Sequence, residues 1–162
     1  MEDLYQKLLN AAYHFISFRP RSEKEIREFL QKKRKKLGQA TESMFQRVLD
    51  RLGELGYLDD EKFVRWWIDQ RQSHRPKGIR FIVAELRGKG IAQEVINGVI
   101  EQQSVDSELD GARSIVNKKM KQWKTLPATE QKKKIYEHLA RRGFTSELIH
   151  GIVDEVVYGR VQ

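Results

Sequence analysis

The stretch Leu55-Gly56-Tyr57-Leu58-Asp59-Asp60-Glu61-Lys62-Phe63 decides how this chain folds. Gly56 follows an apolar stripe with helical period, and glycine readily adopts the left-handed conformation that closes a helix. Asp59 suits the N-cap of a new helix, because its carboxylate can accept hydrogen bonds from the unpaired amides of the first turn. Leu58 and Phe63 have the spacing of a hydrophobic staple around that cap. The stretch therefore predicts two helices that are joined stiffly.

Apolar residues recur with helical period on both sides of this joint. No segment shows the sustained two-residue alternation that is typical of a half-buried strand. Ser22 and Glu25 have the spacing of a capping box, which indicates another helix start. Nine helices are expected in all, with bounds that include 4–18, 109–124 and 148–157, and with a polar linker near 104–107. The predicted fold class is all-α.

The sequence also contains an internal repeat. A shift of 53 residues aligns Leu86-Arg87-Gly88-Lys89-Gly90-Ile91 with Leu139-Ala140-Arg141-Arg142-Gly143-Phe144, and apolar positions on both sides of these segments align as well. A shift of 56 residues aligns Ile26 and Leu30 with Ile82 and Leu86. One three-helix unit is therefore expected to occur three times.

The predicted domains are three tandem three-helix repeats at 1–58, 59–105 and 106–162. A unit of this size buries little apolar surface alone, so neighbouring repeats must stack to complete the core. The expected product is an elongated, curved helical array that offers a long surface and no obvious pocket.

Composition narrows the class of protein. Charged residues make up 33% of the chain, hydrophobic residues 39%, and the formal net charge is +8. A basic excess favours an anionic partner. The sequence has no long apolar run and no secretory leader, so neither a membrane span nor secretion is expected. It also has no cysteine, which excludes disulfides and thiolate metal sites. A cytoplasmic, monomeric protein is expected.

Clusters of cations at the two ends of the chain are the candidate contacts to nucleic acid. A run of cations most often marks a solvated helix end, where positive charge suits the helix dipole, and phosphate binding is the functional alternative. The residues predicted to bind nucleic acid are Lys32, Lys33, Arg34, Lys35, Lys118, Lys119, Lys132, Lys133, Arg141 and Arg142.

A third cluster lies in the middle repeat, around a helix break at Pro76 and Gly78. Cations on both sides of such a break can converge on one surface, and an aromatic residue beside them offers an apolar contact. The residues predicted to bind a partner protein are Arg71, Arg75, Lys77, Arg80 and Phe81.

No catalytic or metal-binding constellation is apparent. The four histidines, His14, His74, His138 and His150, are scattered and lack the spacing of metal ligands. Gly88-Lys89-Gly90 is interpreted as a helix end and not as a phosphate-binding loop, because its repeat partner has the same form. The hypothesis that the chain is an undetected hydrolase has no support except the presence of histidines and acidic residues. A binding protein without cofactor or metal is therefore expected, and not an enzyme.

The string Leu-Gly-Tyr-Leu-Asp-Asp-x-x-Phe at the joint resembles the signature of the RecX family, the small bacterial regulators of the RecA recombinase. The resemblance covers nearly the whole chain. It also rests on Ser22-Glu23-Lys24-Glu25-Ile26-Arg27, Gly78, Ile82, Glu85-Leu86, Lys89-Gly90-Ile91, Leu139 and Arg142-Gly143-Phe144.

This resemblance implies a three-by-three helical array that lodges in the groove of the RecA filament on single-stranded DNA. It implies inhibition of ATP hydrolysis, strand exchange and coprotease activity, in DNA repair, homologous recombination and the SOS response. The family commonly has a basic residue where this chain has Phe81, so either Arg80 takes over the cationic contact or the partner surface has changed. A general module that binds single-stranded or double-stranded DNA, without a dedicated protein partner, is the alternative.

Overall fold

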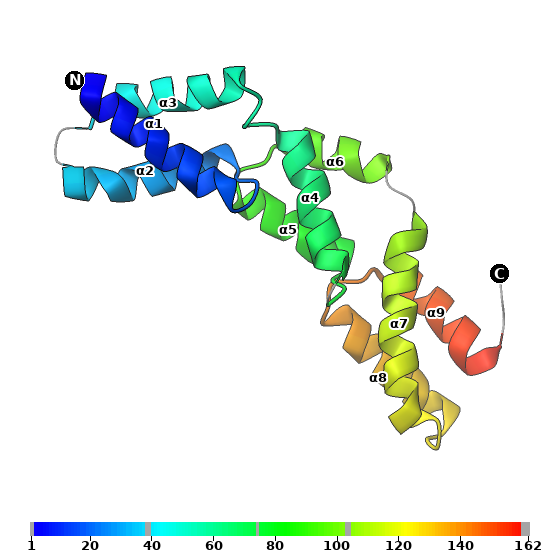
Figure 1. The fold of residues 1–162 in the computed structure, drawn as a ribbon. Helices are drawn as coiled ribbons and strands as arrows, with labels where there is room; N and C mark the ends of the chain where they lie inside the picture. The colour runs from blue at the N-terminus through cyan, green and yellow to red at the C-terminus, as the bar shows by residue number, and fades with distance from the viewer. Residues whose placement is uncertain (1, 38–39, 74, 103–104, 160–162) are drawn as a thin grey trace. The chain divides into compact units, whose positions relative to one another are not determined.

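A computed structural model describes residues 2–37, 40–73, 75–102 and 105–159, which form nine α-helices and no strand (Figure 1). In chain order these are α1 (Glu2–Ser17), α2 (Glu23–Leu37), α3 (Glu42–Glu54), α4 (Asp60–Ser73), α5 (Ile79–Gly88), α6 (Gln93–Glu101), α7 (Val105–Trp123), α8 (Ala128–Ala140) and α9 (Ser146–Tyr158). None of these helices is long and apolar enough to cross a membrane. The all-α fold is thereby confirmed.

All three of the expected helix starts are wrong, and α1 begins at Glu2 and not at residue 4. Helix α7 begins at Val105 and not near 109, so most of the expected linker is helical. Polar residues interrupt the apolar period there, but polar and acidic residues also suit the first turn of an exposed helix. Helix α9 begins at Ser146, because Thr145 caps it by accepting a hydrogen bond from the Leu148 amide at 3.3 Å.

The fold contains two compact units, each with its own core. Unit 1 comprises Met1–Trp66 with Leu86–Asn97, and unit 2 comprises Trp67–Glu85 with Gly98–Gln162. In unit 1, α1, α2 and α3 pack on one another around a core of Leu8, Leu9, Ala12, Ile26, Leu30, Ala40, Met44, Phe45, Val48, Leu49 and Leu52. In unit 2, α7, α8 and α9 enclose Ala112, Ile115, Val116, Ile135, Leu139, Phe144, Ile149, Ile152 and Val153.

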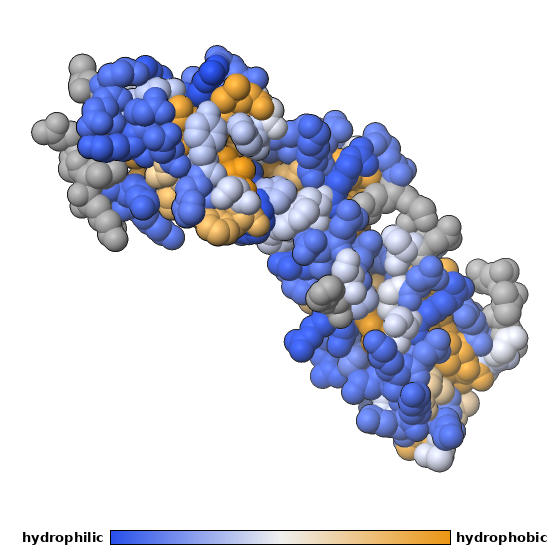
Figure 2. All heavy atoms as spheres, viewed as in Figure 1, coloured by the Kyte–Doolittle hydropathy of each residue, from blue (hydrophilic) through white to orange (hydrophobic). Residues whose placement is uncertain are grey.

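Most of the surface visible in Figure 2 is hydrophilic, and hydrophobic residues show as separate patches. This agrees with the burial of the apolar helix faces inside each unit. The domain boundaries at 1–58, 59–105 and 106–162 remain a prediction.

The helix ends that the sequence aligned have the same hydrogen bonds. The Ile91 amide donates to the Leu86 carbonyl at 3.2 Å, and the Phe144 amide donates to the Leu139 carbonyl at 3.3 Å. Glycines with positive φ close four of the described helices, at Gly56 (74°), Gly90 (82°), Gly143 (84°) and Gly159 (64°). The repeat therefore extends to the backbone geometry of the turns.

The predicted caps are present as well. The Asp59 carboxylate accepts a hydrogen bond from the Lys62 amide at 3.0 Å. At the start of α2, the Glu25 amide donates to Ser22 Oγ at 3.3 Å, while the Ser22 amide donates to Glu25 Oε2 at 3.2 Å. Both caps are therefore confirmed, the second as a complete capping box.

In unit 1, the start of α2 packs on the turn that follows α5. Lys89 Nζ lies 2.7 Å from Glu25 Oε1, and Lys24 Nζ donates to the Gly88 carbonyl at 3.0 Å. Arg19 also binds the Glu25 carboxylate, at 2.7 Å. Burial alone would raise the pKa of Glu25, but its hydrogen bonds outweigh burial and bring the pKa to about 2.

In unit 2, the start of α5 also packs on the turn that follows α8, but through backbone hydrogen bonds. The Gly78 amide donates to the Arg142 carbonyl at 2.8 Å, and the Arg80 amide donates to the Gly143 carbonyl at 3.3 Å. The contact is so close that a Cβ on Gly78 would lie 2.1 Å from the Gly143 carbonyl carbon. This joint fixes the segment that carries the central cations.

Candidate nucleic-acid and partner interface

Glu85 forms ion pairs with two of the cations around the helix break in the middle repeat, Arg71 and Lys77. Its carboxylate accepts hydrogen bonds from Arg71 Nε at 2.6 Å, from Trp67 Nε1 at 2.9 Å and from the Lys77 ammonium. Burial raises the pKa of Glu85, but the hydrogen bonds from Lys77, Arg71 and Trp67 lower it by more, so the net shift is downward. The Arg71 guanidinium also lies over the Trp67 ring, 4.3 Å from its centroid. Arg71 therefore holds α4 against α5, and Lys77 holds the segment between these helices against Glu85 of α5.

The expected convergence of four cations on one surface is thus not what the structure contains. Arg71 and Lys77 turn to Glu85, whereas Arg75 and Arg80 are exposed and form no ion pair with a carboxylate in the described part of the chain. The physical reason is that Glu85, on the next helix, is close enough to compensate two of the four charges. Sequence reasoning did not assign Glu85 a role.

Phe81 is partly covered. Its side chain is 43% exposed, and its ring lies against Gly143: a Cβ on Gly143 would be 2.6 Å from Phe81 Cγ. Phe81 therefore supports the joint between α5 and the turn after α8 while still offering apolar surface beside Arg80.

A pocket of about 180 Å³ brings together residues from three separate segments. Arg75 and Pro76 come from the segment between α4 and α5, and His138 comes from α8. Its lining is completed by Ile115, Lys118 and Lys119 of α7 and by Arg142 after α8. The pocket joins Arg75, predicted to contact a protein, to three cations predicted to contact nucleic acid.

The charged residues that line this pocket are all cations. Within the described residues, Arg75, Lys118, Lys119 and Arg142 form no ion pair with a carboxylate. Burial lowers the pKa of His138 from its ordinary value of 6.5, and the charges of Arg142, Lys119 and Arg141 lower it further. The Nε2 atom of His138 is buried and has no hydrogen-bond partner among the described residues.

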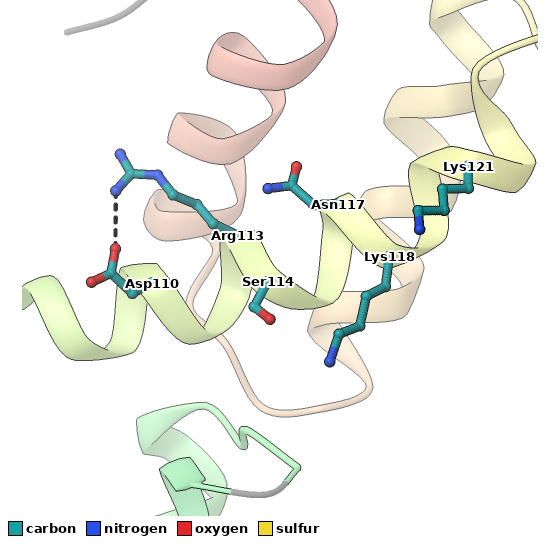
Figure 3. Close-up of a pocket in the computed structure, with 6 residues that line it drawn as sticks. All are labelled: Asp110, Arg113, Ser114, Asn117, Lys118 and Lys121. Atoms are coloured by element: carbon teal, nitrogen blue, oxygen red, sulfur yellow. Dashed lines mark hydrogen bonds and ion pairs between the residues drawn. The ribbon is translucent and has the colours of Figure 1, made fainter.

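A second, shallower groove of about 460 Å³ lies along α7 (Figure 3). Arg113 lies there 3.3 Å from Asp110, and its guanidinium also binds Glu155 at 2.9 Å. Lys118 and Lys121 extend from the same helix without a drawn partner, and Lys118 lines both this groove and the pocket. The groove is therefore mixed in charge at one end and cationic at the other.

A third depression, in unit 1, does not favour an anion. Its lining of Glu23, Lys24, Arg27, Asp60, Gly90 and Ile91 includes two carboxylates. Arg27 binds Glu23 at 3.1 Å, which compensates its charge. Burial, together with Glu23 and Asp59, raises the pKa of Asp60.

The other cations that are predicted to bind nucleic acid do not line the pocket. Lys132, Lys133 and Arg141 are exposed in unit 2, as are Lys32 and Arg34 in unit 1. Lys33 is half-buried, with its ammonium 5.4 Å from the centroid of the Phe29 ring. The side chain of Lys35 and all of His74 lie outside the described residues.

The part of the chain that the structure describes holds no group of metal ligands. Over the described ranges, no three histidine or acidic side chains gather where a metal ion would need them. The sequence alone assigns His138 no function. His138 becomes a candidate only because it lies on an apolar face close to cations of another helix, and a single sequence does not show that these residues are close in space.

Comparison with known proteins identifies the family of the chain. Three RecX domain models match in order: the first three-helix domain at 9–52, the second at 59–100 and the third at 106–153. Two solved structures share the fold. A RecX crystal structure from Lactobacillus salivarius has a TM-score of 0.84 at 19% identity, with 96% of this chain and 98% of that chain covered. A second structure, of regulatory protein RecX, has a TM-score of 0.77 at 23% identity, with 95% and 75% covered.

Curated relatives carry the same name. Regulatory protein RecX of Listeria monocytogenes is 34% identical over 94% of this chain and 55% of its own length. That of Bacillus subtilis is 30% identical, over 96% and 57%. That of Thermobifida fusca is 27% identical, over 95% and 80%. The chain spans little more than half the length of the first two of these relatives. With three family domains matched in order along it, this chain belongs to the RecX family.

Proposed function

We propose that this chain binds the RecA recombinase filament on single-stranded DNA and inhibits its ATP hydrolysis, strand exchange and coprotease activity. The observation that carries the proposal is the ordered match of three RecX domains over most of the chain. We place this activity in DNA repair and homologous recombination in the cytoplasm, with the chain acting as a monomer that needs no cofactor.

The middle repeat supplies the contact to RecA in this proposal. Arg80 and Phe81 are adjacent, exposed and fixed at the start of α5 by the hydrogen bonds to the turn after α8. Arginine and aromatic residues on a rigid support are the residue types that dominate binding energy at protein interfaces. Arg71 and Lys77 act indirectly, because they position the segment through Glu85.

The direct test measures RecA ATP hydrolysis on single-stranded DNA at increasing concentrations of this protein. We expect the rate to fall until the filament is saturated. A rate that stays constant at a molar excess of this protein over RecA would contradict the proposal.

The second candidate is a nucleic-acid-binding module without a dedicated partner, and it is favoured by the pocket of four cations that have no carboxylate partner among the described residues. Salt separates the two functions. A complex held by about six phosphates loses about a thousandfold in affinity between about 50 and 200 mM salt, because bound counterions are released on association. A complex held mainly by protein contacts loses much less.

A further inference from the structure

We propose that the pocket lined by Arg75, Lys119, Arg142 and His138 holds one phosphate group of a nucleic-acid strand. The choice of nucleic acid as the source of this phosphate rests on the proposed function. The existence of an oxyanion site does not, since it follows from the geometry and charge of the pocket.

The size of the pocket suits a phosphate group. Its volume is about 180 Å³, well above the roughly 10 to 15 Å³ that a cavity needs to hold one water molecule. The pocket therefore has room for a tetrahedral oxyanion. The lining comes from three segments, so an occupant is contacted from several sides.

The charge of the pocket is not compensated from within. Three other cations of unit 2 have carboxylate partners, Arg71 and Lys77 in Glu85 and Arg113 in Glu155, whereas exposed cations such as Arg80 have none among the described residues. Four cations line the pocket, and none of them pairs with a described carboxylate. Like charges brought together repel one another, so an anion between them lowers the free energy. Arginine in particular can bind phosphate oxygens with two parallel hydrogen bonds.

His138 adds a second, independent indication. Its Nε2 atom is buried without a partner among the described residues, and a buried polar atom without a hydrogen bond costs free energy. The charged groups around it are Arg75, Lys118, Lys119, Arg141 and Arg142, all of them cationic. Because Nε2 is closed to solvent, an oxyanion in the pocket would act on the imidazole through its charge and would offset the repulsion that these cations exert on a protonated His138.

The proton on His138 is then linked to binding. Burial and the surrounding cations hold the pKa of free His138 below 6.5, and a bound oxyanion favours the imidazolium, so it raises that pKa. Binding takes up a proton at every pH between the two values. Affinity for the oxyanion therefore increases as the pH falls through that window.

The surroundings favour a polymer of phosphates over a free nucleotide. Lys118 lines both the pocket and the groove along α7, and Lys121 continues the cationic side of that groove (Figure 3). A strand carries further phosphates that can neutralise these lysines, whereas a nucleotide does not reach along the helix. A nucleic-acid backbone can therefore contact both the pocket and the lysines of the groove along α7.

The first experiment uses sulfate, which stays a dianion between about pH 5 and 8 and so does not titrate itself. Sulfate is added to the full chain while the imidazole signals of the histidines are followed by NMR, with His138 assigned by its loss in His138→Gln. We expect the His138 pKa to rise with sulfate, and sulfate affinity to increase at lower pH in the wild type but not in His138→Gln. An unchanged His138 pKa at saturating sulfate would overturn the oxyanion site.

The second experiment measures binding of a labelled oligodeoxythymidylate over a range of salt concentrations. Lys119→Gln combined with Arg142→Gln should weaken binding about tenfold or more and reduce the salt slope by about one, because both side chains contact the same phosphate. The matched control, Lys124→Gln with Lys134→Gln, removes the same charge from exposed positions that neither line the pocket nor belong to the residues predicted to bind nucleic acid. Equal losses in the two double variants would show only diffuse attraction and overturn the site.

Two further arms identify the source of the phosphate and separate this inference from the proposed function. ATP that competes with the oligonucleotide for the pocket at equal phosphate concentration would contradict the choice of a strand. Inhibition of RecA without any oligonucleotide binding at the pocket would leave the proposed function and remove this inference. Oligonucleotide binding at the pocket without any effect on RecA would support this inference and contradict the proposed function.

Discussion

The Gly78 amide donates to the Arg142 carbonyl at 2.8 Å, so a helix of the second repeat takes its N-terminal cap from the third. The next amide, of Ile79, donates to Glu108 Oε1 at 2.9 Å, and that of Arg80 donates to Gly143. The first amides of an α-helix have no partner inside the helix. Helix α5 thus begins where it does because α7 and the turn after α8 supply the acceptors.

Gly78→Ala tests this joint. The new Cβ would lie 2.1 Å from the Gly143 backbone, so the two segments must separate and their hydrogen bonds must lengthen. We expect a loss of about 3 kcal/mol in the free energy of unfolding, measured by urea denaturation. Gly98→Ala in α6 is the control, because no atom lies within 4 Å of its added Cβ. That variant should be as stable as the wild type or slightly more stable, and equal stability of Gly78→Ala would refute the close contact.

Gly56→Val tests the joint between α3 and α4. Gly56 has a φ of 74°, and the space that an added Cβ would enter is open, so the cost comes from backbone strain alone. A β-branched residue at positive φ should cost about 1 to 3 kcal/mol, seen as a lower melting temperature. Gly53→Ala, inside α3 and equally open, should instead stabilise the helix by about 0.5 to 1 kcal/mol. A melting temperature unaffected by Gly56→Val would mean that the chain turns differently there.

Glu25→Gln isolates the charge of Glu25, because glutamine preserves the capping box and loses the ion pairs with Arg19 and Lys89. The pKa of Glu25 is lowered from 4.5 to about 2 in the folded chain. Its contribution to stability is therefore complete above pH 4.5 and is lost as the pH falls towards 2.

The variant should be less stable than the wild type by about 2 kcal/mol at pH 7, and the difference should shrink steadily below pH 4.5. Chemical denaturation at several pH values measures both. A difference that does not depend on pH would show that Glu25 acts by shape and not by charge.

Much of the fold follows from local sequence. Helical periodicity predicts the helices, and glycines at equivalent positions of the repeats predict their ends, because Gly90 and Gly143 adopt the same left-handed conformation. The start of α7 does not follow from it, because polar residues suit both a linker and an exposed helix. Neither does the cap on Gly78, since its acceptors lie on a segment far along the chain.

The candidate site is less predictable, for a related reason. The sequence shows which residues are cations, but their compensation depends on acids brought close by folding. Glu85 compensates Arg71 and Lys77 and leaves Arg75 and Arg80 exposed. The pocket combines Arg75, Lys119 and Arg142 from segments that no local pattern connects.

Arg80→Glu with Phe81→Ala tests the proposed RecA contact apart from the phosphate pocket, which neither residue lines. We expect inhibition of RecA ATP hydrolysis to weaken tenfold or more, equivalent to about 1.4 kcal/mol, with little change in oligonucleotide binding. Lys77→Glu would be a poor substitute, because it places a second carboxylate beside Glu85.

Charge reversal of Lys32 and Lys33 in the first repeat is the control for this experiment. It should leave most of the inhibition intact, because both lie in α2 and not in the proposed contact. If that control abolished inhibition while Arg80→Glu with Phe81→Ala had no effect, the contact to RecA would lie in the first repeat.

The most direct test of the central claim is co-sedimentation with RecA filaments assembled on single-stranded DNA with a slowly hydrolysed ATP analogue. Measured at about 200 mM salt, where purely phosphate-held complexes are weak, this protein should sediment with the filament and remain in solution with the same DNA alone. Equal sedimentation with filament and with bare DNA, or none with either, would contradict the account of a protein that recognises RecA.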